Sequence, residues 1–249
     1  MLAPSTSTTR FGRKINVNEW SLRGPSLARV RQHAAEVRVL VIGDSVVYGG
    51  DLVDQGELGT ELAARALGGT AIVVPVAAPS WGPANQLAYL KRFGTFDAQV
   101  AVVVASAHDA FDVPTGDRVE RRWPYLAVAE VAGRVAASSA GVPIDREAER
   151  SALQAFGEML KLLAASGARL VVLLHAGRDE LSGSEPRGLA SLREVALGLG
   201  VKTVDLAPRW RAALENGDNP FADPIHLTVQ GQRILSEVLR DEVRLALRK

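Results

Sequence analysis

The stretch from Val37 to Gly50, VRVLVIGDSVVYGG, decides how the rest of the chain is interpreted. Its first six residues include five apolar side chains, four of them β-branched, which is typical of a short buried strand. Gly43 can take the sharp turn out of that strand, so Asp44 and Ser45 follow at its carboxyl end, where α/β sheets bind ligands. Ser45 is a candidate nucleophile if a base lies beside it, although the same residues also fit an ordinary turn with a capping Asp or Ser.

A second polar motif, Asp223-Pro224-Ile225-His226, lies just before the segment predicted as the last helix. Asp223 and His226 are three residues apart, and the proline restricts the backbone between them, so both side chains can lie on one side of a turn. Asp223 would then hold the imidazole in one tautomer and leave its other nitrogen free to accept the serine proton. A surface loop with a helix-capping Asp is the alternative.

Five short apolar segments alternate with segments of helical periodicity along the chain. Strands are predicted at residues 37–42, 71–77, 99–105, 168–174 and 201–206, and helices at 57–67, 83–93, 148–166, 186–199, 208–216 and 228–247. This order predicts the α/β class, with a doubly wound, five-stranded parallel sheet in a three-layer α/β/α arrangement. We expect residues 37–249 to form one domain after an irregular lead-in at 1–36, whose first ten residues are predicted to be disordered. Residues 112–147 are predicted to be a solvated connection rather than a lid, with a helix over 125–137.

The composition argues against several function classes. The 249 residues include 29 basic and 28 acidic side chains, a net charge of +1, so neither nucleic acid nor an anionic membrane is predicted as a partner. The chain has no cysteine, its four histidines lack metal-ligand spacing, and GDSVVYGG lacks the lysine and glycine spacing of phosphate-binding loops, so no metal or cofactor is predicted. No apolar run reaches the ~20 residues of a membrane span and no signal peptide is evident, so a cytoplasmic location is the default expectation. The composition does not predict the oligomeric state.

The serine after the first strand and the DxxH before the last helix together resemble the SGNH hydrolases, also called GDSL-type esterases. The resemblance spans residues 37 to 239 approximately. It implies a flavodoxin-like α/β/α fold and an acyl-ester hydrolase in which Ser45 is the nucleophile, His226 the base and Asp223 the residue that orients the base. Such chemistry also needs hydrogen-bond donors for the oxyanion.

Two of the oxyanion donors expected from this resemblance are altered in the chain. The family uses the backbone N–H of the serine, the N–H of a glycine after the second strand and an asparagine side chain after the third. The glycine position falls on Ser80, whose N–H can serve if its φ is negative or the strain is tolerated, with Gly82 as the alternative donor. The asparagine position falls on His108, which can donate one N–H as a neutral imidazole or can instead be a partly buried structural histidine.

Three functions are compatible with this resemblance. The first is hydrolysis of a small acyl ester, such as an O-acetyl group on a carbohydrate. The second is transfer of the acyl group to a polysaccharide hydroxyl, because some polysaccharide O-acetyltransferases resemble this domain. The third is a catalytically weak relative that binds carbohydrate or acts as a scaffold, which only the changes at Ser80 and His108 support. Two further residues could line the pocket, His175 at the end of the predicted fourth strand and Trp81, although Trp81 more often signals packing.

Overall fold

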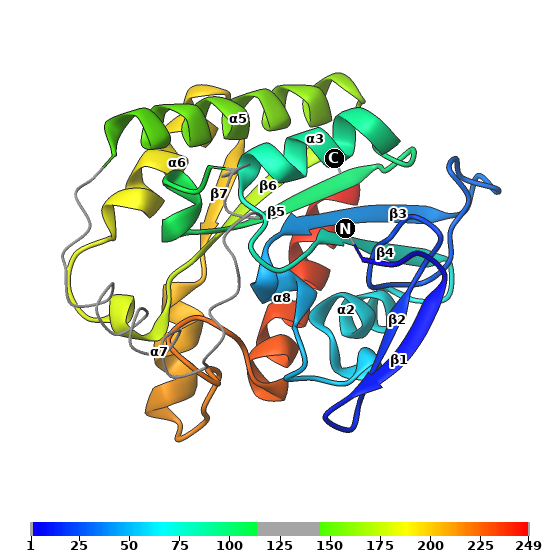
Figure 1. The fold of residues 1–249 in the computed structure, drawn as a ribbon, viewed down its shortest axis with the longest axis horizontal. Helices are drawn as coiled ribbons and strands as arrows, with labels where there is room; N and C mark the ends of the chain where they lie inside the picture. The colour runs from blue at the N-terminus through cyan, green and yellow to red at the C-terminus, as the bar shows by residue number, and fades with distance from the viewer. Residues whose placement is uncertain (1, 114–144, 249) are drawn as a thin grey trace, which may run out of the picture.

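Five parallel strands form the central sheet of the computed structural model, which describes residues 2–113 and 145–248 (Figure 1). The strands are β3 (Val37–Gly43), β4 (Ala71–Ala77), β5 (Val100–Ser106), β6 (Arg169–His175) and β7 (Lys202–Asp205). Their order in the sheet is β4-β3-β5-β6-β7, and each neighbouring pair is parallel. The chain therefore moves outward from β3 to β4, crosses back to β5 and continues to β7, which confirms the predicted doubly wound α/β sheet.

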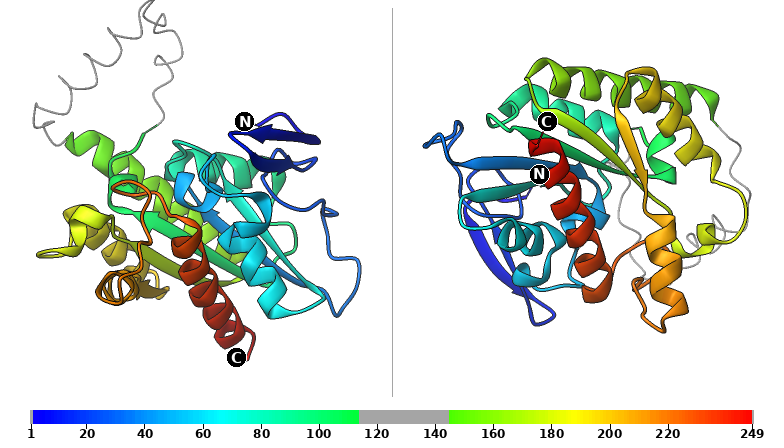
Figure 2. Two further views of the ribbon diagram at one scale, coloured as in Figure 1. Left: turned by 90° about the horizontal axis from the view of Figure 1, so that it is seen from below. Right: turned by 180° about the vertical axis from the view of Figure 1, so that it is seen from behind.

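Helices cover both faces of this sheet (Figure 1). One face carries α3 (Pro83–Phe93), α5 (Arg146–Ala165) and α6 (Arg187–Gly198), with α3 and α6 each packed against α5. The opposite face carries α2 (Gly59–Leu67) and α8 (Val229–Leu247), which lie side by side in the view from behind (Figure 2). The short α7 (Ala207–Glu215) follows β7. These layers agree with the predicted α/β/α arrangement.

The core follows directly from the apolar runs in the sequence. β3 and β5 lie between other strands, and every residue of β5 is buried, as expected for parallel strands covered on both faces. The helices bury side chains at helical spacing, which for α5 are Phe156, Met159, Leu160 and Leu163. Helix ends carry the expected caps, since Asp145 accepts hydrogen bonds from two N–H groups of α5 and Thr228 accepts one from Gly231 in α8.

The lead-in differs from the prediction. Residues 1–10 were expected to be disordered, but β1 (Thr6–Arg10) and β2 (Arg13–Val17) form an antiparallel hairpin. Threonine favours extended backbone, and both turn residues, Phe11 and Gly12, have positive φ, as a two-residue hairpin turn requires. The pattern was missed because the strand is polar throughout, so it has no alternation of apolar and polar residues.

Arg23 ties this lead-in to the main domain. Its side chain is fully buried and donates to the backbone carbonyls of Tyr48, Gly50, Val53 and Lys14. Two of these residues belong to the loop that follows the GDS turn, so the lead-in fixes that loop from outside the sheet.

The predicted helix at 125–137 lies outside the described residues. Among the residues that are described, no helix is both long and apolar enough to cross a membrane.

Candidate active site

Ser45 lies where β3 ends and the four-residue helix α1 (Ser45–Tyr48) begins. Asp44 caps this helix by accepting a 2.8 Å hydrogen bond from the Val46 N–H through Oδ1. Gly43 is required at the turn because a Cβ there would lie 2.5 Å from the Val47 side chain. The local sequence thus presents the Ser45 hydroxyl at the carboxyl edge of the sheet, as predicted.

The DxxH segment forms a turn that brings Asp223 and His226 to Ser45. Asp223 Oδ1 accepts hydrogen bonds from the backbone N–H groups of Ile225 (2.9 Å) and His226 (2.8 Å), which closes the turn. Asp223 Oδ2 lies 2.6 Å from His226 Nδ1, and His226 Nε2 lies 2.8 Å from Ser45 Oγ. The carboxylate can only accept, so Nδ1 carries the proton and Nε2 is free to accept from the serine hydroxyl.

The charge of Asp223 is favoured by this arrangement. Partial burial opposes the ionised form, but the hydrogen bonds from the His226 and Ile225 N–H groups and from the His226 ring outweigh it and lower the pKa of Asp223 below its ordinary value. A carboxylate that stays ionised can orient the imidazole and stabilise it when it becomes charged.

Gln232 of α8 holds the Ser45 side of the site. Its side-chain nitrogen donates to the Val46 carbonyl of α1 at 3.0 Å, and its side-chain oxygen accepts from the Gly59 N–H of α2 at 2.8 Å. This buried side chain connects α1, α2 and the helix that follows the DxxH turn. Gln232 could not be identified from the sequence, because its partners are more than 170 residues away.

His108 lies in the short helix η2 (Ala107–Ala110) that follows β5. Its Nε2 lies 3.0 Å from Asp44 Oδ2 and 4.0 Å from Asp109 Oδ1. The side chain is 47% exposed, and its partial burial opposes a charged imidazole. The contact with Asp44 and the nearby carboxyl groups of Asp109 and Asp112 outweigh this effect and raise the pKa of His108 to about 9. The sequence argument expected a neutral imidazole here, and that expectation was wrong because it did not include the carboxylates that surround the ring.

Asp109 and Asp44 complete a buried acidic pair beside His108. Asp109 Oδ2 accepts from the Ser106 N–H at 2.8 Å, while burial and the nearby Asp44 charge raise the pKa of Asp109 to about 8. Burial also opposes the Asp44 charge, but the contacts with His108 and Val46 outweigh it and lower the pKa of Asp44. The surroundings therefore favour the charged forms of Asp44 and His108 and oppose the charged form of Asp109.

The same three side chains have the composition of a metal site. One imidazole nitrogen and two carboxylate oxygens, from Asp44, His108 and Asp109, lie within 4.8 Å of one another. The sequence predicted no metal because the histidines lack ligand spacing. Spacing along the chain does not reveal this group, because Asp44 follows β3 whereas His108 and Asp109 follow β5. In this structure the imidazole and Asp44 form an ion pair, and a cation could bind there only by displacing the imidazole proton.

Ser80 has a left-handed backbone conformation, which glycine adopts more readily than other residues. Its φ is +60°, in the left-handed region, so the condition of a negative φ is not met and the serine tolerates the strain. Its backbone N–H forms no hydrogen bond with any residue that the structure describes. Gly82, the alternative donor, lies outside the pocket and instead precedes α3, where its carbonyl accepts from Asn85 and Gln86.

A pocket of about 740 Å³ brings most of the predicted residues together. Its described lining consists of Asp44, Ser45, Pro79, Ser80, His108, Phe111, Asp112, Ile225 and His226. Asp223 lies behind His226, as a residue that only orients the base should. His175 does not line the pocket, because it is fully buried beneath the DxxH turn. Asp44, Phe111 and Asp112 were not singled out from the sequence, although all three lie next to motif residues.

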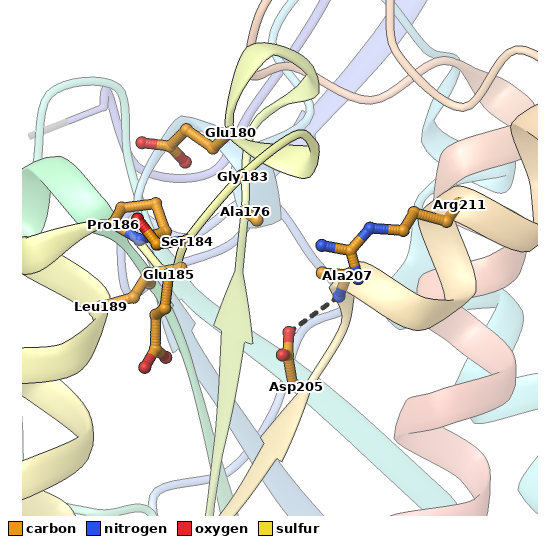
Figure 3. Close-up of a pocket in the computed structure, with 10 residues that line it drawn as sticks. All are labelled: Ala176, Glu180, Gly183, Ser184, Glu185, Pro186, Leu189, Asp205, Ala207 and Arg211. Atoms are coloured by element: carbon orange, nitrogen blue, oxygen red, sulfur yellow. Dashed lines mark hydrogen bonds between the residues drawn. The ribbon is translucent and has the colours of Figure 1, made fainter.

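Two other pockets contain none of the predicted triad residues. Trp81 lines a shallow pocket of about 260 Å³ with Asn85, Tyr89 and Arg92 on α3, and its ring packs against Tyr89 at 5.4 Å. A pocket of about 140 Å³ lies at the carboxyl ends of β6 and β7 (Figure 3). The carboxylates of Glu180, Glu185 and Asp205 and the Arg211 guanidinium surround it in Figure 3, and Asp205 accepts from the Ala207 N–H.

The sequence profile of the GDSL-like lipase/acylhydrolase family matches residues 41–234, which include both the GDS turn and the DxxH turn. The chain belongs to this family. A search of curated protein sequences finds no match. The family assignment agrees with the resemblance seen in the two motifs, and it makes acyl-ester hydrolysis the class of reaction to be considered.

Solved structures of esterases and an acylhydrolase share the fold at low sequence identity. An acetyl xylan esterase, AlAXEase, is 15% identical with a TM-score of 0.57, covering 83% of this chain and 100% of its own. A lipase/acylhydrolase from Enterococcus faecalis is 15% identical with a TM-score of 0.53, covering 84% and 95%. The psychrotrophic esterase EstA from Pseudoalteromonas sp. is 11% identical with a TM-score of 0.54, covering 86% and 100%. These similarities support the fold and leave the substrate to be argued from the site.

Proposed function

We propose that the protein is a serine-dependent acyl-ester hydrolase in which Ser45, His226 and Asp223 form the catalytic triad. The observation that carries the proposal is the pair of contacts at 2.8 Å from Ser45 Oγ to His226 Nε2 and at 2.6 Å from His226 Nδ1 to Asp223 Oδ2. Nucleophile, base and orienting carboxylate are thus within direct hydrogen-bonding distance without any rearrangement. These two contacts argue against the alternative of a catalytically weak protein that only binds carbohydrate or acts as a scaffold.

In the proposed reaction the Ser45 oxygen attacks the ester carbonyl carbon while its proton passes to His226 Nε2. The tetrahedral intermediate then collapses, the acyl–oxygen bond breaks, and the leaving alcohol takes the proton from His226. Water repeats the sequence on the acyl-serine and releases the acid. Asp223 stays ionised throughout, in agreement with its lowered pKa, and stabilises the imidazolium that forms in each half of the reaction.

Three N–H donors are available for the oxyanion in this proposal. The backbone N–H groups of Ser45 and Ser80 form no hydrogen bond with the described residues, and Ser80 lines the same pocket as Ser45. His108 supplies the third as an imidazolium: Asp44 takes its Nε2–H, and Nδ1–H remains for the substrate. A charged donor is stronger than the amide of the family's asparagine. The replacement at His108 is thus compatible with catalysis.

The pocket favours a short acyl group on a polar alcohol. Among the described lining residues, Pro79, Phe111 and Ile225 are apolar, whereas Ser80, His108 and Asp112 are polar and can form hydrogen bonds with hydroxyl groups. An O-acetylated carbohydrate fits this mixture, and an acetyl xylan esterase is among the proteins that share the fold. The relatives found are hydrolases, so we propose water as the acyl acceptor rather than a sugar hydroxyl.

The test is hydrolysis of a p-nitrophenyl ester series from acetate to octanoate by wild type and Ser45→Ala. The account expects the highest kcat/KM for acetate and loss of turnover in Ser45→Ala. A second assay with acetylated xylan and added free oligosaccharide measures whether the acetyl group goes to water or to sugar. Equal rates for the two forms would refute the triad, and transfer to the oligosaccharide in excess of acetate release would make the protein an acyltransferase.

A further inference from the structure

His175 is fully buried beneath the turn that carries Asp223 and His226. Its Nε2 lies 3.0 Å from the backbone carbonyl oxygen of Ile225, the residue immediately before His226. A carbonyl can only accept, so Nε2 carries the proton, and Nδ1 has no partner among the described residues. Burial keeps the ring neutral by lowering the pKa of His175. The structure therefore fixes this ring in one tautomer with a single hydrogen bond.

Aromatic neighbours restrict the rotation of this ring. Trp210 meets it edge to face, with centroids 5.6 Å apart and planes at 85°, and Phe221 lies 6.0 Å from it on the chain leading into the turn. Trp210 and Phe221 also contact each other at 5.7 Å. The donor at Nε2 is consequently held in place by packing as well as by its bond to Ile225.

The residues after His175 contact the same turn. The Arg178 N–H donates to the Pro224 carbonyl at 2.7 Å. A Cβ at Gly177 would lie 2.7 Å from the same carbonyl oxygen, so only glycine allows this close approach. His175 and Arg178 thus donate to two consecutive carbonyls of the turn, those of Ile225 and Pro224, and Gly177 leaves room for the Pro224 carbonyl.

The contacts with the end of β6 fix the position of the turn relative to the sheet, which the hydrogen bonds within the turn do not. Asp223 bonds only to Ile225 and His226 within the described residues, and the Ala222 N–H bonds to the His226 carbonyl, so these bonds fix the shape of the turn but not its position relative to the sheet. Ser45 belongs to the sheet edge. Gln232 joins the following helix α8 to α1, and the contacts with the end of β6 join the turn itself to the sheet, so the distance from Ser45 to His226 depends on both.

We propose that His175 is a positioning residue that sets His226 at hydrogen-bonding distance from Ser45, assisted by Gly177. The inference rests on the proposed function, because it gives the Ser45–His226 contact a catalytic purpose. A misplacement of about 1 Å at a distance from the chemistry can cost about a hundredfold in rate. Loss of the His175 donor should therefore slow the nucleophile without altering any group that touches substrate.

The test compares four variants of the full chain by the rate at which a fluorophosphonate labels Ser45, by kcat and KM for p-nitrophenyl acetate, and by Tm. His175→Phe keeps an aromatic ring beside Trp210 but removes the donor to Ile225. His175→Gln returns an N–H close to the Nε2 position. Gly177→Ala pushes on the Pro224 carbonyl while leaving His175 intact, and Trp210→Phe is the matched control that weakens packing but keeps the donor.

We expect His175→Phe and Gly177→Ala to lower the labelling rate and kcat by about ten- to a hundredfold, with a much smaller change in KM. His175→Gln should recover most of the rate, and Trp210→Phe should lower Tm while labelling close to the wild-type rate. Wild-type labelling in folded His175→Phe, or rates that follow Tm across all four variants, would overturn the positioning role. If His175→Phe does not fold, wild-type labelling of Gly177→Ala overturns it. A wild type that is not labelled at Ser45 instead refutes the proposed function itself, and the positioning role with it.

Discussion

In the proposed mechanism, Ser45, Asp223 and His226 form the triad side of the pocket, and contacts of 2.8 and 2.6 Å join them in the order that the motifs predict. Ser80 and His108 form the proposed oxyanion side, where Ser80 has a left-handed backbone and His108 stands in place of the amide that the resemblance implies. The difference follows from the chemistry. A proton relay needs particular side chains at fixed distances, whereas an oxyanion needs only N–H groups, which several residue types can supply.

The largest effects are expected on the triad side. His226→Ala should lower kcat for p-nitrophenyl acetate by about 10⁶-fold and Asp223→Asn by about 10⁴-fold, since removal of the base is costlier than loss of its orientation. Stopped assays with purified variants, checked by Tm for folding, measure both. Retention of more than a tenth of the wild-type rate in either variant would break the comparison, because the triad side would then not be catalytic.

The oxyanion side should respond in a graded way to changes at His108. His108→Ala removes one donor and should lower kcat by about 10²–10³-fold, equivalent to about 2.7–4 kcal/mol of transition-state stabilisation. His108→Asn restores a neutral N–H and should retain much of the activity. Equal activity of the alanine form and the wild type would show that His108 is structural, and the oxyanion would then depend on backbone N–H groups alone.

Ser80 provides a test of backbone strain on the same side. A non-glycine residue in the left-handed region costs roughly 1–2 kcal/mol, and part of this is offset because glycine has more freedom to lose on folding. Ser80→Gly should therefore raise the free energy of unfolding by up to about 1 kcal/mol, measured by urea denaturation. Ser80→Ala keeps the strained φ and should show no gain. A destabilised glycine variant would mean that the serine hydroxyl, rather than the backbone, determines stability at this position.

The charge on His108 predicts a smaller, pH-dependent effect on stability. Its pKa is about 9 in the folded protein against about 6.5 in an unfolded chain, so the folded form binds more protons between these values. The stabilisation is complete below about pH 6.5 and is lost as the pH rises through 9, and the raised pKa of Asp109 acts in the same direction. Tm of the wild type should fall over this range more than Tm of His108→Asn. If Tm of the wild type and of His108→Asn changed equally with pH over this range, the imidazole of His108 would not carry the proposed charge.

The sequence predicted the parts of this molecule that depend on local pattern. The five apolar runs located the sheet, and the GDS and DxxH motifs located three residues that the structure brings together. The charge of His108 could not be predicted, because its closest carboxylate is that of Asp44, which reaches the ring from the end of β3, a different strand from the one that precedes His108. The His175 contact joins residues 50 positions apart, and the first strand of the hairpin, residues 6–10, is polar throughout and has no apolar periodicity to reveal it.

The most direct test of the central claim is to map the site of fluorophosphonate modification by peptide mass spectrometry after reaction with the wild type. The account predicts a single adduct on the peptide that contains Ser45 and none in Ser45→Ala, with labelling slowed in His226→Ala because the serine loses its base. An adduct on another serine, or no adduct at a concentration that labels a known serine esterase, would contradict the assignment of Ser45 as the nucleophile.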